Sequence, residues 1–204
     1  MVGDSRMKTV ASAAVAALVI LSAAHARAKE VVVKKTWDIG RPAADLVRTL
    51  AAYDQYCAHG CRYQVPSVVT AQILSYERHP DDFYTWTSVK DVKDSTWFSH
   101  VTVRRGDGRA RVEIRMVTPE LGATLEKTTR REHAPSVEVT SNVYELDELR
   151  DGDRFRTTRV TLTSTVVLSG VSAAFGSGIV HDRLEEAAKA MHQNLLRPPP
   201  PESH

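Results

Sequence analysis

The sequence lacks the motifs that identify many enzymes and nucleotide-binding proteins. It contains no Gly-x-Ser-x-Gly elbow, no His-Glu-x-x-His sequence and no glycine-rich loop that could cradle a phosphate. It also lacks an excess of charge of one sign, because 27 Lys and Arg residues oppose 25 Asp and Glu residues. The basic stripe typical of nucleic-acid-binding proteins is therefore missing. We identify no catalytic residue and expect no cofactor and no nucleic-acid partner.

A long apolar run occurs only at the N-terminus. Arg6 and Lys8 precede the uncharged segment Val10–Ala24, and two overlapping small-x-small sites follow, the second ending at Ala28. The apolar run of about 15 residues is shorter than the roughly 20 residues that span a bilayer. This pattern predicts a signal peptide over residues 1–28, cleaved near Ala28, and an exported, periplasmic protein. The alternatives are a retained membrane anchor and a true start at Met7.

Cysteine is scarce, and the two cysteines, Cys57 and Cys61, lie in Cys-Ala-His-Gly-Cys. In an exported protein so close a pair is most simply a disulfide, and Gly60 allows the chain to turn between the two sulfurs. Closing a loop of about five residues contributes only about 2 kcal/mol, so the bridge would fix a local turn. A functional redox pair is one alternative. A metal site that includes His59 is another, but it needs a fourth ligand that no second Cys/His cluster supplies, so we expect no metal.

The mature chain of about 176 residues has the size of one domain with a hydrophobic core. No internal repeat or interior linker divides it, and we assign residues 29–197 to a single domain. The run Pro198–Pro201 cannot continue a helix, so we expect residues 198–204 to form a disordered tail.

The order of elements along the mature chain is predicted by hydrophobic periodicity. The β-branched segment Glu30–Ile39 predicts a strand, and Pro42 opens a helical stretch. A second short helix or turn follows over residues 53–61. Strands with short, turn-forming connections then predict an antiparallel meander. The candidate strands are Ser67–Arg78, Phe83–Val92, Thr96–Arg105, Ala110–Val117, Ala123–Thr129, Val137–Leu149 and Arg154–Leu168.

The last element is predicted to be an amphipathic helix that begins near Ser172 or Gly178 and ends at Leu196. One face of this helix is apolar and comprises Phe175, Ile179, Val180, Leu184, Ala187, Ala188, Met191 and Leu195. Such a helix can cover the apolar face of a curved antiparallel sheet.

This order of elements resembles the START-like, or SRPBCC, superfamily, which has the helix-grip fold. The turn Tyr53-Asp54-Gln55-Tyr56 and the segment Val65-Pro66-Ser67-Val68 before the second strand add to the resemblance. The superfamily includes lipid-transfer START domains, birch-pollen allergens, polyketide cyclases and coenzyme-Q-binding proteins. The resemblance implies an α+β fold in which a curved antiparallel sheet of about six or seven strands wraps around the long C-terminal helix, with two short helices after the first strand.

Such a fold leaves a cavity between sheet and helix, and concave apolar cavities hold small ligands. Aromatic residues make up only 6% of the sequence, yet several lie on the two strands after Asp82. Strand parity places His100 and Arg159 on the outer face of the sheet, and we expect Glu138, Asn142 and Tyr144 to lie there too. The expected cavity lining is Trp86, Trp97, Val101, Val112, Ile114, Met116, Leu162, Val166, Phe175, Ile179, Leu184 and Met191.

The sequence thus favours an exported carrier that holds a hydrophobic molecule or lipid, with transient membrane contact as a possible part of its cycle. A polyketide cyclase or aromatase-like enzyme is one alternative, which requires polar groups that converge inside the cavity. A cell-envelope interaction protein with a collapsed cavity is another.

Overall fold

The computed structural model describes residues 28–75, 81–90, 94–170, 173 and 176–200. The predicted signal peptide up to residue 27, Phe175 and residues 201–204 of the predicted tail lie outside this part of the chain. Among the described residues, no helix is both long enough and apolar enough to cross a membrane.

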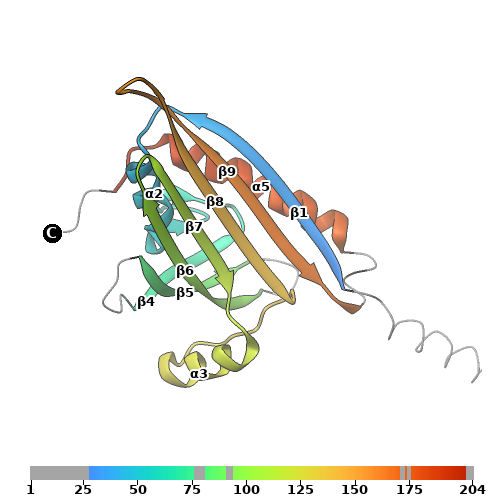
Figure 1. Ribbon diagram of the computed structural model, residues 1–204. Helices are drawn as coiled ribbons and strands as arrows, with labels where there is room; N and C mark the ends of the chain where they lie inside the picture. The colour runs from blue at the N-terminus through green and yellow to red at the C-terminus, as the bar shows by residue number, and fades with distance from the viewer. Residues whose placement is uncertain (1–27, 76–80, 91–93, 171–172, 174–175, 201–204) are drawn as a thin grey trace, which may run out of the picture.

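The fold is built on one seven-stranded sheet in the order β1-β9-β8-β7-β6-β5-β4. Each neighbouring pair of strands is antiparallel. The predicted α+β class and the predicted meander are therefore confirmed, with β1 returning to pair with the last strand. Figure 1 shows the sheet with α5 running behind β1 and β9. The strands are β1 (Lys29–Ile39), β4 (Val68–Ser75), β5 (Asp82–Val89), β6 (Thr96–Gly106), β7 (Arg109–Met116), β8 (Val139–Asp151) and β9 (Arg154–Leu168).

The segment Ala123–Thr129, predicted as a strand, instead belongs to the helix α3 (Pro119–Thr129). Its threonines favour a strand in isolation, but the capping residues decide otherwise. The hydroxyl of Thr118 accepts a hydrogen bond from the backbone N–H of Leu121 (3.4 Å), and the proline occupies the first turn. Arg130 ends the helix in the left-handed conformation with φ of 57°.

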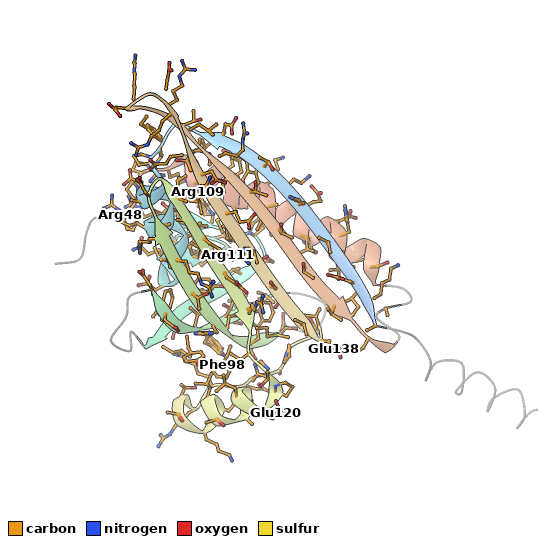
Figure 2. The ribbon with its side chains drawn as sticks, viewed as in Figure 1. Arg48, Phe98, Arg109, Arg111, Glu120 and Glu138 are labelled. Carbon is orange, nitrogen blue, oxygen red and sulfur yellow. A yellow bond between two sulfur atoms is a disulfide. The ribbon has the colours of Figure 1, made fainter. Side chains whose placement is uncertain are left out.

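Helix α3 lies at the end of the sheet near Phe98, as Figure 2 shows. The His133 ring, just after α3, stacks on the fully buried Phe98 ring with centroids 5.7 Å apart. The Nδ1 atom of His133 accepts a hydrogen bond from the backbone N–H of Phe98 (3.2 Å). Burial lowers the pKa of His133, and the nearby Glu126 carboxylate opposes that shift. A neutral His133 therefore joins the segment after α3 to β6.

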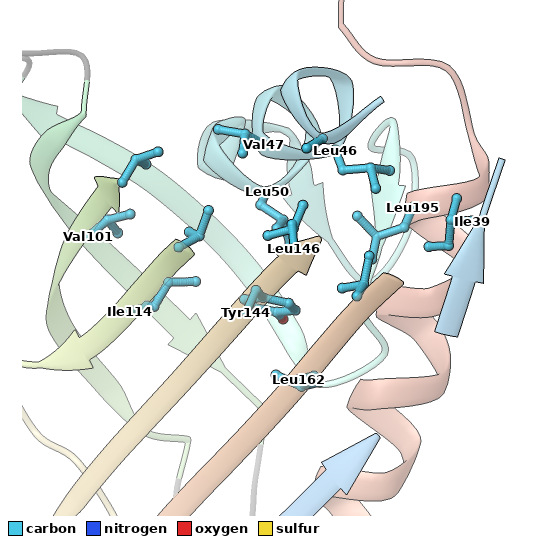
Figure 3. Packing of buried hydrophobic residues seen from close by; sticks show 14 of the residues in the cluster. Ile39, Leu46, Val47, Leu50, Val101, Ile114, Tyr144, Leu146, Leu162 and Leu195 are labelled. Carbon is cyan, nitrogen blue, oxygen red and sulfur yellow. The ribbon is translucent and has the colours of Figure 1, made fainter. Parts of the chain in front are cut away.

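Two short segments follow β1. Helix α2 (Ala43–Ala51) forms where it was predicted and buries Leu46, Val47 and Leu50. Figure 3 shows these three side chains packed close to Leu146 of the sheet. The second segment is only a single 3-10 turn, η1 (Tyr53–Gln55), so the expected second helix is reduced to one turn.

Cys57 and Cys61 form the predicted disulfide, with their Cα atoms 5.6 Å apart. Between them, Gly60 has φ of +83°, a conformation that side chains with a Cβ disfavour. Two-residue strands, β2 (Tyr56–Cys57) and β3 (Tyr63–Gln64), flank the loop and pair in parallel. The disulfide therefore closes the turn that presents β3 to the C-terminal helix.

The C-terminal helix α5 (Ser177–Leu196) is attached to β3 by Asn194, whose side chain is 1% exposed. The Asn194 amide oxygen accepts a hydrogen bond from the backbone N–H of Gln64 (3.1 Å), and its amide nitrogen donates to the Gln64 carbonyl (2.9 Å). The Pro198 carbonyl also accepts a hydrogen bond from the Tyr63 hydroxyl (3.1 Å). The first residues of the predicted tail therefore contact the domain.

Along its length α5 packs on β1 and β9. The Lys35 ammonium pairs with the Glu185 carboxylate at 2.6 Å, and the Trp37 and His192 rings stack with centroids 5.1 Å apart. These contacts place α5 chiefly over the β1 and β9 side of the sheet.

Candidate functional site

One face of the sheet, called here the inner face, looks toward α2 and α5. It consists of the alternate residues of each strand that include Val33, Phe83, Val101, Val112, Tyr144 and Leu162. The largest hydrophobic cluster joins this face to Leu46 and Leu50 of α2 and to Ala188 and Leu195 of α5. Figure 3 shows part of this cluster.

A second apolar cluster lies on the inner face near the start of α5. Val31, Val166, Leu168 and Ala173 form it, and Val180 and Leu184 of α5 pack against it. The inner face is therefore apolar at both ends of the long strands β8 and β9.

Between the two clusters the inner face carries two pairs of polar side chains, with Met116 and Ile114 of β7 between them, and we call these polar residues together the polar row. Within this row Thr85 of β5 lies opposite Ser99 of β6, and Asn142 of β8 lies opposite Ser164 of β9. The row also includes Thr87. A line of polar groups on a buried face is costly unless those groups find partners.

The inner face next to the polar row is only partly covered. Trp97 and Met116 point to this face by register but keep partial exposure, and so do Thr140 and Asn142. The packing of α5 on β1 and β9 explains this exposure, since the helix lies to one side of β6 and β7. Apolar surface of Trp97 and Met116 is therefore accessible beside the polar row.

A group of hydroxyls, called here the hydroxyl cluster, adjoins the polar row and consists of Tyr53, Tyr144, Thr85 and Thr87. Thr85 is fully buried and Thr87 is 3% exposed. Neither Oγ1 atom has a hydrogen-bond partner of normal geometry in the described part of the chain. Burial raises the pKa of the Tyr53 phenol, and the nearby hydroxyls of Thr87 and Thr85 offset part of that rise. The Tyr53 phenol is therefore close to both threonines without a well-formed bond to either.

Tyr144 brings a second phenol to the hydroxyl cluster. Its side chain is 3% exposed, and burial, followed by the effect of Tyr53, raises its pKa far above the ordinary value. Within the described residues its phenol makes no side-chain hydrogen bond. The neighbouring Tyr56 also has a raised pKa, chiefly through burial, but its hydroxyl donates to the Thr49 carbonyl (2.8 Å). These phenols therefore remain protonated at neutral pH and act as hydrogen-bond donors rather than as bases.

Lys35 and Glu148, charged side chains at the ends of the inner face, are paired with opposite charges, and Lys29 donates to the Ser177 hydroxyl (2.8 Å). Lys35 pairs with Glu185 at the β1 edge. Glu148 pairs with Arg150 and accepts a hydrogen bond from the backbone N–H of Ala43, and these two bonds lower its pKa. Within the described parts of the chain, no group of His, Cys, Asp and Glu residues could hold a metal ion. The chemistry of the site is hydrogen bonding by neutral groups inside an apolar face.

The two threonine hydroxyls without partners among the described residues lead to a prediction about the stability of the protein. We expect Thr85→Val and Thr87→Val each to raise the free energy of unfolding of ligand-free protein by about 1 kcal/mol, because a buried hydroxyl without a partner is costly. The control is Thr158→Val, since Thr158 is also fully buried but donates to the Arg41 carbonyl (2.6 Å). That variant should lose about 1 kcal/mol. Urea denaturation measures all three, and an equal loss in Thr85→Val and Thr158→Val would contradict the prediction.

The structure places most of the expected lining residues on the inner face or on α5. Val101, Val112, Ile114 and Leu162 are buried in the largest cluster, and Val166 is buried in the cluster near the start of α5. Trp97 and Met116 lie beside the polar row. Leu184 and Met191 are partly exposed residues of α5 that pack against these clusters.

Two expected lining residues lie elsewhere. Trp86 is on the outer face, where the Arg131 guanidinium lies over its ring at 4.6 Å and its Nε1 donates to the Glu132 carbonyl (3.2 Å). Ile179 is 60% exposed, because the helical position of Ile179 is turned away from that of Val180. Phe175 lies outside the described residues.

The polar residues of the strands are distributed between the two faces of the sheet differently from what the sequence predicted. Arg159 lies on the outer face as predicted and pairs with Asp38 at 2.9 Å, and His100 lies there beside Asp82. Asn142 and Tyr144, expected outside, instead lie on the inner face. Glu138 is exposed and precedes β8. The sequence analysis therefore did not identify Tyr144, Tyr53 and the polar row as residues of the inner face. The only local signal for Tyr144 and Asn142 was that they alternate with other residues along β8.

A groove of about 530 Å³ at the β6–β7 turn is a weaker candidate site. Arg109 and Arg111, labelled in Figure 2, line it together with Glu145 and Asp147. Arg109 pairs with Asp147 at 3.0 Å and Arg111 with Glu145 at 2.9 Å. The charges of the groove therefore compensate each other, and the inner face is the better candidate.

No protein-family model matches the sequence, and no curated protein matches it. Solved structures with similar folds do exist. A START superfamily protein from Mycobacterium smegmatis aligns with a TM-score of 0.54 and 12% identity, over 80% of this chain and 96% of that chain. Human STARD10 aligns with a TM-score of 0.53 and 12% identity, over 81% of this chain and 63% of that chain.

A third similar structure is the Zhui aromatase/cyclase from Streptomyces sp. R1128. It aligns with a TM-score of 0.50 and 18% identity, over 82% of this chain and 90% of that chain. Sequence identities this low establish the fold and leave the activity open. The chain has the START-like, helix-grip fold that its sequence resembles.

Proposed function

We propose that the protein is an exported, periplasmic binding protein that encloses a hydrophobic, lipid-like molecule between the inner face and α5. The observation that carries the proposal is the partly covered inner face beside the polar row. Trp97 and Met116 are large apolar side chains that keep exposure there, between two buried apolar clusters. An apolar ligand in this place removes their surface from water, at about 25 cal/mol per Å².

Two observations support export, and export in turn supports a carrier function. The N-terminal apolar run predicts a signal peptide, and the Cys57–Cys61 disulfide suits an oxidising compartment. Lipids that cross an aqueous compartment need their chains shielded, since each buried CH₂ contributes about 0.8 kcal/mol. The START-like fold of the similar structures fits ligand binding of this kind.

A cyclase-type enzyme is the second candidate, favoured by the Tyr144 phenol that has no hydrogen-bond partner among the described residues. A phenol in this position could donate a proton or a hydrogen bond to an enolate oxygen. Acid–base catalysis at neutral pH requires a group whose pKa lies near 7. Burial instead raises the pKa of both Tyr53 and Tyr144, and this favours binding over catalysis.

Native mass spectrometry of protein purified from the exported fraction, followed by organic extraction and lipid analysis, tests the proposal. We expect a stoichiometric apolar molecule and a protein mass that corresponds to cleavage after Ala28. A ligand-free mass, with no binding of the uncharged dye N-phenyl-1-naphthylamine, would contradict the carrier function and favour an interaction protein.

A pair of neighbouring residues provides a matched control for this experiment. Asn142→Trp places an indole in the polar row, whereas Val143→Trp places it on the outer face of the same strand. We expect the first variant to lose the bound molecule at least about tenfold and the second to retain it, because only the first occupies ligand volume. Circular dichroism checks that both variants are folded.

A further inference from the structure

The hydroxyl cluster brings together hydrogen-bond donors that have few partners among the described residues. The phenol of Tyr144 makes no side-chain hydrogen bond among the described residues, and within the same part of the chain the Tyr53 phenol is close only to the hydroxyls of Thr85 and Thr87. The Oγ1 atoms of Thr85 and Thr87 are buried and likewise unpaired within the described residues. Buried polar groups are usually paired, so two buried unpaired hydroxyls beside the Tyr53 and Tyr144 phenols indicate a site for a polar atom from outside the chain.

The same region offers no charge with which to neutralise a charged ligand. The inner-face positions next to the cluster are Phe83, Ser99, Val101, Val112 and Asn142, all of them neutral. The charged side chains Lys35 and Glu148, at the edges of the inner face, are already paired, with Glu185 and Arg150. A buried carboxylate or phosphate without a counter-charge loses more in desolvation than it gains from hydroxyl donors.

From these two observations we infer that the ligand is uncharged and carries an acceptor oxygen, a carbonyl or a hydroxyl, which binds the Tyr53 and Tyr144 phenols. The inference rests on the proposed carrier function and specifies its ligand class. Both phenols are donors at neutral pH because burial keeps them protonated. Each can therefore donate to the same oxygen, and the threonine hydroxyls lie close to the Tyr53 phenol.

The apolar part of such a ligand lies along the inner face beyond the polar row. Trp97 and Met116 keep partial exposure there. On the helix side Met191 packs against the two clusters nearest Tyr53, and its sulfur lies 3.7 Å from the Tyr56 hydroxyl. Methionine adapts its shape to a ligand more readily than branched side chains do. A long-chain ketone or alcohol satisfies both the donors and the apolar surface.

Competition against N-phenyl-1-naphthylamine fluorescence on delipidated full-length mature protein tests this inference. The competitors are 2-dodecanone, dodecan-1-ol and dodecanoate at pH 7.4, which share their chain length and differ in the polar end. We expect the ketone and the alcohol to bind at least about tenfold more tightly than the carboxylate. Dodecanoate binding equal to or tighter than that of the alcohol would overturn the inference.

Variants that each lack one phenol hydroxyl test where the polar end of the ligand binds. Tyr144→Phe and Tyr53→Phe should each weaken 2-dodecanone binding about fivefold to tenfold and leave the dye affinity unchanged. The control is Tyr84→Phe, since Tyr84 lies on the outer face and stacks on His100 with ring centroids 4.8 Å apart. If neither inner variant differs from this control, the assigned site is wrong although the protein binds apolar molecules. If the dye and all three competitors fail to bind, the carrier function itself is wrong.

Discussion

Replacing Asn194 by leucine lowers the free energy of unfolding by about 2–4 kcal/mol and the thermal midpoint by about 5–15 °C. The Asn194 side chain is 1% exposed, and both ends of its amide bond the backbone of Gln64. Leucine has a similar volume but removes both part-buried hydrogen bonds to the Gln64 backbone and leaves the buried side of α5 without them. Urea denaturation followed by circular dichroism measures the loss.

Gln193→Leu is the matched control, because this residue precedes Asn194 on the same helix and is exposed. We expect it to change stability by less than about 0.5 kcal/mol. A loss in the Asn194 variant no larger than in this control would show that the contact between α5 and β3 contributes little. The position of α5 over the inner face would then depend on its contacts with β1.

Replacing Gly122 by alanine lowers the free energy of unfolding by about 1–3 kcal/mol, although alanine is the better helix former by about 1 kcal/mol. A Cβ at this position of α3 would lie 2.7 Å from Cδ2 of His133. The His133 ring cannot withdraw freely, because it stacks on Phe98 and accepts a hydrogen bond from the backbone of that residue. Thermal and urea unfolding of the variant measure the effect.

Two further variants separate the clash from helix propensity. Ala123→Gly, at the exposed neighbouring position, should cost about 1 kcal/mol through propensity alone. Gly122→Ala combined with His133→Ala should be more stable than the sum of the two single effects, with a coupling of at least about 0.5 kcal/mol. A stabilising Gly122→Ala variant would mean that His133 moves aside and that α3 is not fixed against Phe98.

The proposed function depends on which strands of the sheet α5 covers and which it leaves partly exposed. Helix α5 is held at one end by Asn194 and along its length by Lys35 and Trp37, and all these contacts lie toward β1 or β3. The inner face of β6 and β7 therefore keeps Trp97 and Met116 partly exposed. The contacts that fix the helix therefore also leave apolar surface of Trp97 and Met116 accessible beside it.

Local patterns were sufficient to predict most elements of the fold. Strict alternation in β7 and β9 predicted which residues face inward, and Ile114 and Leu162 are buried as expected. The apolar stripe predicted α5, and the short spacing of Cys57 and Cys61 predicted their disulfide. These features depend on residues close together in the sequence, where periodicity and spacing are informative.

Local patterns failed where the local signal was mixed. The threonines of α3 favoured a strand, but the cap at Thr118 and the contact with Phe98 favour the helix. In β5 the aromatic Trp86 was expected inside, yet Phe83 takes the inner face and Trp86 packs under Arg131. Arg131 lies far from Trp86 in the sequence, so the sequence gives no local sign of this contact.

The sequence by itself determined the α+β class, the order of the strands in the meander, the covering helix and the disulfide, because each follows from periodicity or spacing over short segments. The tertiary structure alone decided what faces the ligand. Register across β7, β8 and β9 turns Asn142 and Tyr144 inward, and the turn after α2 brings Tyr53 to Thr85 and Thr87. Polar side chains are compatible with either face of a strand, so only pairing with distant strands determines whether they become surface residues or the donors of a binding site.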